Sequence, residues 1–311
     1  MADLPKRSLG VLGPEVTVIG LGCNNFGRFV DLDGTRAVVD AALEEGITFF
    51  DTANTYGNPR GRSEEFLGDV LQGRRDEVVL ATKFGMDMGD GRGPRGSREY
   101  VLQACEASLR RLRTDVIDYY WYHRPDGVTP IAETLETLHE LVQAGTVRYV
   151  GASNFSAEQI EEADAVARER DFTPFTAVQN NYSLLNREAE REVLPTCERL
   201  GLGFVPFYPL AAGLLTGKYH RGEPAPEGTR LATREQVASD EQFDVVEAVA
   251  RFAAERDVSM IEVAIGALLA RPVVSTAIAG ATKPEQVRVN AAAARWTPSE
   301  CDVDELEELV K

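Results

Sequence analysis

Short runs of β-branched and aromatic residues alternate along this chain with segments of helical periodicity. Eight such runs recur, mostly about thirty residues apart, which is the length of one strand plus one helix. Most are apolar almost throughout, as expected where both faces of a parallel strand are covered. The predicted strands are Thr17–Gly22, Ile47–Asp51, Val78–Lys83, Val116–Tyr122, Val147–Gly151, Thr176–Gln179, Gly203–Phe207 and Ser275–Ala279.

Strict alternation of strands and helices predicts an α/β protein of the closed (β/α)8 type, a TIM barrel, and a doubly wound open sheet is the alternative. We expect residues 1–311 to form one domain, with the N-terminal segment closing the bottom of the barrel. Capping boxes are predicted at Ser156 with Gln159 and at Ser259 with Glu262, because each pair would satisfy two amide donors at a helix start.

Two long insertions, Gly85–Gly96 and His220–Asp240, follow strands of the predicted barrel. Both would emerge as long loops at the C-terminal face, where this architecture builds its active sites. Each is either a surface loop or a lid.

The charge balance excludes several function classes. The chain has 33 Lys and Arg against 50 Asp and Glu, a net charge of −17, which disfavours binding to nucleic acid and to anionic membranes. The longest uncharged stretch, Leu200–Gly217, is interrupted by prolines and glycines and is predicted to be a strand and loop instead of a membrane span. No apolar run typical of a signal peptide opens the sequence, so we expect a cytoplasmic protein. Four scattered cysteines and three histidines predict neither a disulfide framework nor a metal site.

Polar side chains sit where the predicted strands end. In a parallel barrel all of these ends face one mouth, so residues far apart in sequence are expected to converge. Each alone has a structural explanation, such as a helix cap, a solvated charge or a core hydrogen bond. The strand-end residues are Asp51, Lys83, His123, Ser153, Asn154, Gln179, Tyr208 and Gly280.

Four of the residues near these ends suggest proton transfer to a carbonyl oxygen. The hydroxyl of Tyr56 has an ordinary pKa of about 10, and the ammonium of Lys83 is predicted to lower that pKa. Asp51 would keep Lys83 charged, and His123 would orient the carbonyl oxygen. Since this set contains no nucleophile and no metal, the electron pair is predicted to arrive as hydride from a cofactor.

Seven ordered segments resemble the signature segments of the aldo-keto reductases. They run from Gly20 to Asn290, and the nearest branch resembles bacterial reductases and potassium-channel β subunits. The segments are FFDTANTYG, ATKFG, YWYHRPD, GASNF, VQNNYS, FYPLAAGLLTGKY and AGATKPEQVRVN.

The resemblance implies a (β/α)8 barrel that reduces an aldehyde or ketone with NADPH, with Asp51, Tyr56, Lys83 and His123 as the catalytic residues. Tyr56 would be the general acid. A small-molecule carbonyl compound is the implied partner, and NAD is a possible second cofactor. The implied cofactor contacts are Cys23, Asp51, Ser153, Asn154, Gln179, Tyr208, Pro209, Leu210, Ala211, Gly213, Leu214, Lys218, Gly280, Thr282, Lys283, Gln286 and Asn290.

Two positions depart from the family pattern. Many members carry an arginine where Gln286 stands and an acidic residue where Val289 stands, so a strong partner for the 2′-phosphate of NADP is missing while Lys283 remains. The pattern Gly20-Leu21-Gly22 lacks the third glycine of a dinucleotide fingerprint, because Asn25 occupies that place, and is interpreted as a tight strand exit.

Two other functions remain open from the sequence. One is a Schiff-base lyase or aldolase with Lys83 as the nucleophile, and the other is a cofactor-binding regulatory subunit that senses redox state with low turnover. The substrate pocket is predicted to be lined by loop residues that are apolar except for Asn24. Each could also be barrel packing, which is the preferred interpretation for Phe26. The set is Asn24, Phe26, Phe84, Met86, Trp121 and Tyr122.

Overall fold

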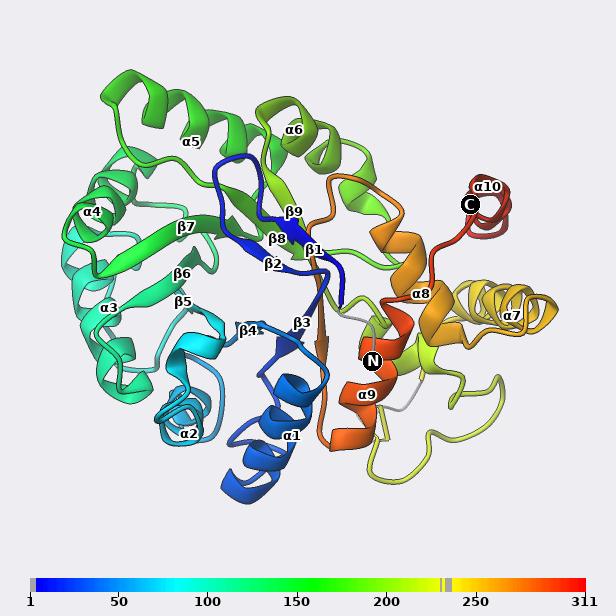
Figure 1. Ribbon diagram of the computed structural model, residues 1–311. Coiled ribbons are helices and arrows are strands. Elements are labelled where there is room, and N and C mark those ends of the chain that lie inside the picture. Colours follow the sequence, from blue (N-terminus) through cyan, green and yellow to red (C-terminus); the bar gives the residue numbers. More distant parts are fainter. Residues whose placement is uncertain (1–3, 230, 233–236) are drawn as a thin grey trace.

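The computed structural model describes residues 4–229, 231–232 and 237–311. Eight parallel strands close into a barrel in the order β10-β3-β4-β5-β6-β7-β8-β9 (Figure 1). Closure confirms the predicted (β/α)8 barrel and excludes the open sheet, because β10 pairs with both β3 and β9. Part of the predicted insertion 220–240, namely residues 230 and 233–236, lies outside the described residues.

Each predicted strand is confirmed, with its limits shifted by a few residues. Most strand residues are buried, since alternate side chains pack inside the barrel and against the helices. The barrel strands are β3 (Ile19–Gly22), β4 (Phe49–Asp51), β5 (Val79–Phe84), β6 (Ile117–Tyr122), β7 (Val147–Ser153), β8 (Ala177–Asn181), β9 (Gly203–Phe207) and β10 (Ala277–Gly280).

Helices surround the barrel, and both predicted capping boxes are present at Ser156 and Ser259. Further boxes at Ser239 and Ser299 begin the helices α7 and α10. The α-helices are α1 (Leu32–Glu44), α2 (Arg62–Val70), α3 (Arg98–Leu112), α4 (Ile131–Gln143), α5 (Ala157–Arg170), α6 (Val193–Leu200), α7 (Asp240–Glu255), α8 (Met260–Leu269), α9 (Pro284–Ala293) and α10 (Glu300–Leu309). Among the described residues there are also three short 3-10 helices, η1 (Arg75–Glu77), η2 (Glu188–Glu190) and η3 (Ala211–Thr216).

A two-stranded hairpin closes the bottom of the barrel, as predicted for the N-terminal segment. Strands β1 (Lys6–Ser8) and β2 (Glu15–Thr17) pair antiparallel and lie across the open end (Figure 1). Leu9 and Val16 from this hairpin are buried in one cluster with side chains of the barrel interior, among them Tyr119 and Trp121. The barrel axis is therefore filled with apolar side chains from its bottom end.

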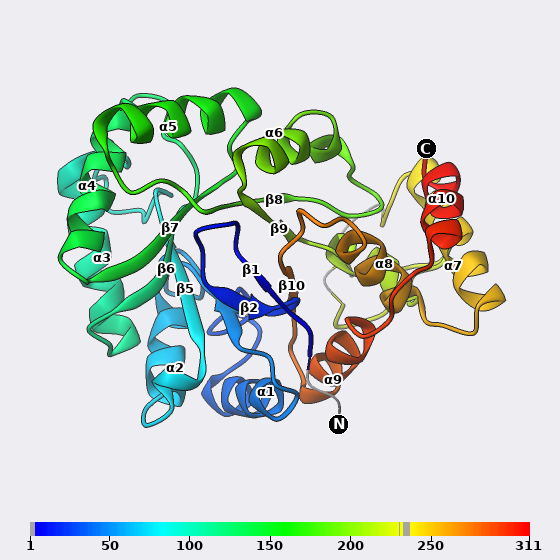
Figure 2. The same cartoon turned by 45° about the horizontal axis from the view of Figure 1, so that its top comes forward.

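A second apolar core lies beside the barrel, where α7 and α10 stand outside the ring of helices next to α8 (Figure 2). It joins Phe243 and Phe252 of α7 to Val263 of α8 and Leu306 of α10. Leu214 of η3 is buried in the same core. The loop that follows β9 is thus anchored by packing that is separate from the barrel interior.

No helix in the described part of the chain is long and apolar enough to cross a lipid bilayer. Within the same residues, no group of three or more His, Cys, Asp and Glu side chains is placed to hold a metal ion.

A buried carboxylate ties three neighbouring strands together below the site. Asp118 of β6 accepts a hydrogen bond of 2.8 Å from the main-chain N–H of Leu80 in β5. It also forms ion pairs with Arg75, at 2.6 Å, and with Arg148 of β7, at 2.5 Å. Removal of this carboxylate would leave a buried N–H without an acceptor.

We therefore expect Asp118→Ala to lower the free energy of unfolding by about 2–3 kcal/mol, the cost of an orphaned buried donor plus a broken ion pair. Asp115→Ala is the matched control, because Asp115 is exposed two residues before β6, and it should change stability by less than about 0.5 kcal/mol. Urea titration followed by circular dichroism measures both variants. Equal stability of the two would contradict the role given to Asp118.

Candidate active site

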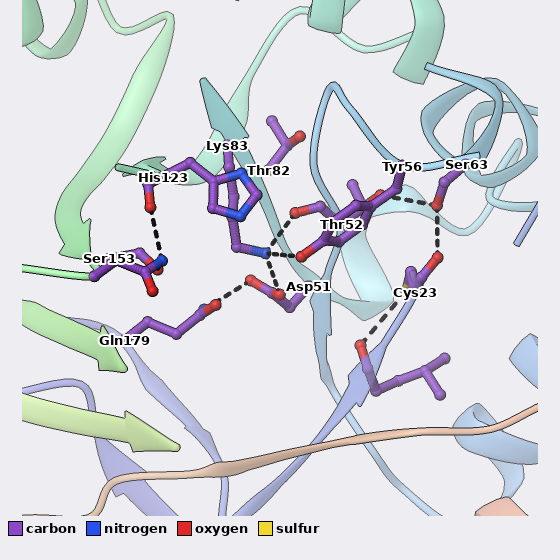
Figure 3. Close-up of polar contacts among 12 residues, drawn as sticks. Cys23, Asp51, Thr52, Tyr56, Ser63, Thr82, Lys83, His123, Ser153 and Gln179 are labelled. Carbon is purple, nitrogen blue, oxygen red and sulfur yellow. Dashed lines mark hydrogen bonds and ion pairs between the residues drawn. The ribbon is translucent and has the colours of Figure 1, made fainter. Parts of the chain in front are cut away.

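Polar side chains from five adjacent strands meet at the mouth of the barrel (Figure 3). Asp51 ends β4, Lys83 lies near the end of β5, and His123 directly follows β6. Ser153 ends β7 and Gln179 belongs to β8. All five are buried, and contacts link Lys83 to Asp51 and Asp51 to Gln179. The predicted convergence is thus seen for these members of the strand-end set.

The ammonium of Lys83 is the centre of this group. Its Nζ donates to the carboxylate of Asp51 and, at 2.8 Å, to the main-chain oxygen of Thr52. The hydroxyl oxygen of Tyr56 lies 3.5 Å from the same nitrogen. Three oxygen atoms thus surround one buried ammonium, and of these three acceptors only the hydroxyl of Tyr56 carries an exchangeable proton of its own.

The ion pair keeps Lys83 charged although its side chain is fully buried. Burial by itself lowers the pKa of Lys83, but the attraction of Asp51 and the contact with Tyr56 outweigh it, so the pKa is raised. Burial also raises the pKa of Asp51, and the ammonium opposes that shift together with a hydrogen bond of 3.0 Å from the amide of Gln179. The counter-charge predicted for Asp51 is present.

The pKa of Tyr56 shifts in the direction opposite to the sequence-based prediction. Burial raises the pKa of the hydroxyl, the ammonium of Lys83 lowers it, and the carboxylate of Asp51 raises it again. The net shift is upward, because removal from water and the negative charge together exceed the effect of one ammonium. Tyr56 therefore holds its proton at neutral pH in this structure.

His123 is held as a neutral imidazole beside Tyr56. Burial lowers its pKa well below the ordinary value, and the positive charges of Lys83 and Arg124 lower it further. The two rings meet edge to face, with centroids 5.9 Å apart. The buried Nδ1 has no hydrogen-bond partner among the described residues, which favours the tautomer with its proton on Nε2, as a donor.

Asn154 joins this group to the neighbouring strand end. Its side-chain nitrogen donates to the main-chain oxygen of His123 at 3.0 Å and to the hydroxyl of Ser153 at 3.1 Å. The residue adopts a left-handed conformation, with φ of 59°, which asparagine tolerates better than most residues.

The loop after β9 presents an aromatic ring and a cation at the rim. Tyr208 directly follows β9, has φ of 57° and is 45% exposed. Ala211, Ala212 and Gly213 also have positive φ, at 47°, 57° and 102°. A Cβ at Gly213 would lie 3.2 Å from Nζ of Lys218, so the absence of a side chain lets the lysine fold against this loop.

The segment between β10 and α9 forms a closed turn. The side-chain oxygen of Gln286 accepts from the main-chain N–H of Thr282 at 2.7 Å and from its hydroxyl at 3.2 Å. Gly280 and Lys283 on the same segment are exposed, whereas Asn290 is buried. Gln286 thus accepts from two donors of Thr282 just before α9 begins.

Two polar residues at the site were missed by sequence reasoning. Thr52 acts through its main-chain oxygen, which leaves no trace in the residue type. Ser63 is a buried serine at the start of α2, and its hydroxyl donates to the main-chain oxygen of Cys23 at 2.8 Å. In sequence it is one small polar residue in the charged run GRSEE, and no signal there separates it from an exposed capping serine.

Four of the predicted pocket residues are barrel packing. Phe26, Phe84, Trp121 and Tyr122 are buried, and the rings of Phe84 and Tyr122 stack 4.9 Å apart. Barrel packing, the alternative left open by the sequence, therefore accounts for the burial of these four side chains. Asn24 and Met86 are only half-buried.

Comparison with known proteins agrees with this geometry. The sequence model of the Aldo/keto reductase family matches residues 18–311. The chain belongs to that family. Its members are oxidoreductases that use a nicotinamide dinucleotide, and the expected resemblance is confirmed.

Individual relatives of this aldo/keto reductase extend over nearly its whole length. It is 35% identical over 301 residues to the L-glyceraldehyde 3-phosphate reductase of Escherichia coli K12, covering 93% of this chain and 87% of the relative. It is 35% identical over 297 residues to a probable voltage-gated potassium channel subunit beta of Oryza sativa, covering 91% and 89%. An uncharacterized oxidoreductase of Bacillus subtilis is 39% identical over 290 residues, covering 90% and 88%.

For this aldo/keto reductase, we expect the imidazole of His123 to stay uncharged at the pH of about 6.5 where a free imidazole is half charged, because its folded-state pKa lies well below that ordinary value. Only the unfolded chain then binds this proton, so the free energy of unfolding should fall as the pH decreases below about 6.5. Nuclear magnetic resonance of the imidazole nitrogens, assigned with His123→Gln, measures the titration.

Arg124→Gln removes one of the two positive charges that depress this pKa, and it should move the His123 midpoint upward. A midpoint of about 6.5 or above in the unaltered protein would contradict the neutral imidazole.

Proposed function

We propose that this protein reduces an aldehyde or ketone to an alcohol with NADPH, and that Asp51, Tyr56, Lys83 and His123 carry the reaction. The observation that supports this most is the 3.5 Å contact between the Tyr56 hydroxyl and a buried ammonium. A proton donor beside a fixed positive charge is suited to a reaction in which negative charge develops on a carbonyl oxygen.

Each of the four side chains has a distinct role in this proposal. Tyr56 is protonated at neutral pH and donates its proton from the hydroxyl oxygen to the carbonyl oxygen of the substrate. Lys83 stabilises the phenolate that remains, and its ion pair with Asp51 keeps the charge in place at a buried position. His123, neutral and protonated on Nε2, donates a hydrogen bond that orients the carbonyl group.

Residues around the mouth fit a nicotinamide dinucleotide, which when bound supplies the hydride. Ser153, Asn154 and Gln179 offer hydroxyl and amide groups next to the four side chains, and the exposed ring of Tyr208 offers an aromatic face. Two features of the loop after β9 suit a pyrophosphate: its run of positive φ values and the nearby ammonium of Lys218. The full set of proposed cofactor contacts is the one implied by the family resemblance, from Cys23 to Asn290.

The charge state of Lys83 weighs against Schiff-base chemistry. A lysine nucleophile needs a depressed pKa so that its amine is free, whereas the ion pair with Asp51 raises the pKa of Lys83. A regulatory role with low turnover is the second candidate, and similarity to a probable potassium channel subunit beta favours it. Oxidation of bound NADPH in a single turnover separates slow chemistry from slow product release.

Tyr56→Phe should lower kcat for NADPH-dependent reduction of a simple aldehyde by at least about a thousandfold, since it removes the proposed acid and the group that Lys83 contacts. Its affinity for NADPH, measured by fluorescence titration, should stay within about threefold of the unaltered protein. Tyr149→Phe is the control, because Tyr149 lies on β7 and stacks with Tyr119 in the barrel interior instead of reaching the site. Retained turnover in Tyr56→Phe would refute the assignment.

The turn at Gln286 should weaken the preference for NADPH over NADH. Its side-chain oxygen already accepts from Thr282, and it brings no positive charge to a 2′-phosphate. Gln286→Arg should raise the affinity for NADPH about tenfold through charge-assisted hydrogen bonds and leave the affinity for NADH nearly unchanged. Fluorescence titration with both dinucleotides measures the ratio of the NADPH affinity to the NADH affinity. If Gln286→Arg leaves this ratio unchanged, the 2′-phosphate does not bind next to residue 286.

A further inference from the structure

The first turn of α2 packs directly behind the site, and one buried serine there contacts the segment after β3 and, at two places, the loop after β4. The hydroxyl of Ser63 lies 2.9 Å from the hydroxyl of Thr52 and 2.8 Å from the main-chain oxygen of Cys23 (Figure 3). The main-chain N–H of Ser63 donates to the main-chain oxygen of Tyr56 at 3.2 Å. These contacts reach the ends of β3 and β4 and the loop that carries the proposed acid.

We propose that Ser63 is a positioning residue that fixes the Tyr56 hydroxyl against the Lys83 ammonium. This inference rests on the proposed function. The contacts form a closed circuit: Ser63 holds Thr52 through the two hydroxyls, Thr52 holds Lys83, and Lys83 contacts Tyr56. Tyr56 returns to Ser63 through the main chain.

The direction of the hydrogen bonds follows from the number of protons. Ser63 has one hydroxyl proton, and the main-chain oxygen of Cys23 can only accept, so that proton goes to Cys23. In the contact with Thr52, Ser63 must therefore be the acceptor and the threonine hydroxyl the donor. A side chain at position 52 without a hydroxyl would break the circuit while leaving the acceptor for Lys83 in place, since that acceptor is a main-chain oxygen.

Helix capping does not account for this serine. The cap of α2 is Gly61, which makes no side-chain hydrogen bond, and the hydroxyl of Ser63 is directed to the strand ends instead. The loop also approaches the helix closely, because a Cβ at Gly57 would lie 2.9 Å from the main-chain nitrogen of Ser63. Gly57 has φ of 96°, a backbone conformation that only glycine adopts without strain.

Ser63→Ala should lower kcat for aldehyde reduction by about tenfold or more, because small displacements of a catalytic group have large effects on rate. The KM for the aldehyde and the affinity for NADPH should change by less than about threefold. Ser108→Ala is the matched control. Ser108 is a fully buried serine on α3 whose hydroxyl accepts from Arg111 at 3.4 Å. The control variant therefore also loses a buried hydroxyl, but one that does not belong to the circuit. Its kcat should stay within about twofold of the unaltered protein.

Thr52→Val tests the same circuit from its other end without changing the size of the side chain. We expect a loss in kcat like that of Ser63→Ala, and the double variant should be little worse than either single one, because both break the same contact. If Ser63→Ala keeps the kcat of Ser108→Ala, or if the effects of Ser63→Ala and Thr52→Val multiply, the proposal is wrong.

A titration of Tyr56 gives a readout that does not require turnover. With tyrosine labelled at the ring carbon that bears the hydroxyl, the Tyr56 signal is assigned by its loss in Tyr56→Phe. In Ser63→Ala its midpoint should move upward, because the hydroxyl moves away from the one charge that favours the phenolate. An unchanged midpoint overturns the positioning role. Absence of aldehyde reduction in the unaltered protein would overturn the proposed function alone, and the titration would still decide the role of Ser63.

Discussion

The site depends on an ion pair between Lys83 and Asp51 at a position with no exposed lysine surface. A buried ammonium is unfavourable unless a negative charge and further acceptors accompany it. Asp51 supplies the charge, and the main-chain oxygen of Thr52 and the hydroxyl of Tyr56 complete its surroundings. Because each partner comes from β4 or the loop after it, the lysine of β5 fixes where that loop must lie. The need for hydrogen-bond acceptors around the Lys83 ammonium thus constrains the position of Tyr56.

The barrel makes this arrangement possible because the contacts that stabilise the fold and the polar residues of the site lie at opposite ends of the strands. Below the site, the buried carboxylate of Asp118 joins β6 to β5 and β7, and the hairpin residues Leu9 and Val16 fill the axis. At the opposite end, the strands present their last residues to one mouth. The second apolar core then anchors the loop after β9 independently. The apolar packing of the barrel thus stabilises a fold in which the buried ion pair of Lys83 and Asp51 can be kept, although burying these charges is itself unfavourable.

The sequence alone predicted the barrel and the residues at its mouth well, for a physical reason. Strands that are buried on both faces consist mostly of apolar residues. A charged residue near the end of such a strand is therefore easy to recognise in the sequence, as Lys83 is after Val79–Thr82. The strands of the hairpin, KRS and EVT, carry no such pattern. The contacts of Thr52 and Ser63 depend on a main-chain oxygen and on the docking of a helix, which residue types do not encode. The predicted direction of the Tyr56 pKa shift was wrong because burial and the carboxylate of Asp51 together outweigh the ammonium of Lys83, and the depth of burial cannot be read from residue types.

The hairpin plug has one more consequence. Leu9 and Val16 fill the axis below Lys83 together with the aromatic layer of Tyr119 and Trp121. We therefore expect the phenol–ammonium pair to exchange protons with the solvent through the rim. A molecule bound at the rim would then separate the pair from bulk solvent. Because the hairpin fills the bottom of the barrel, such a molecule would control the rate of proton exchange at Tyr56 and Lys83.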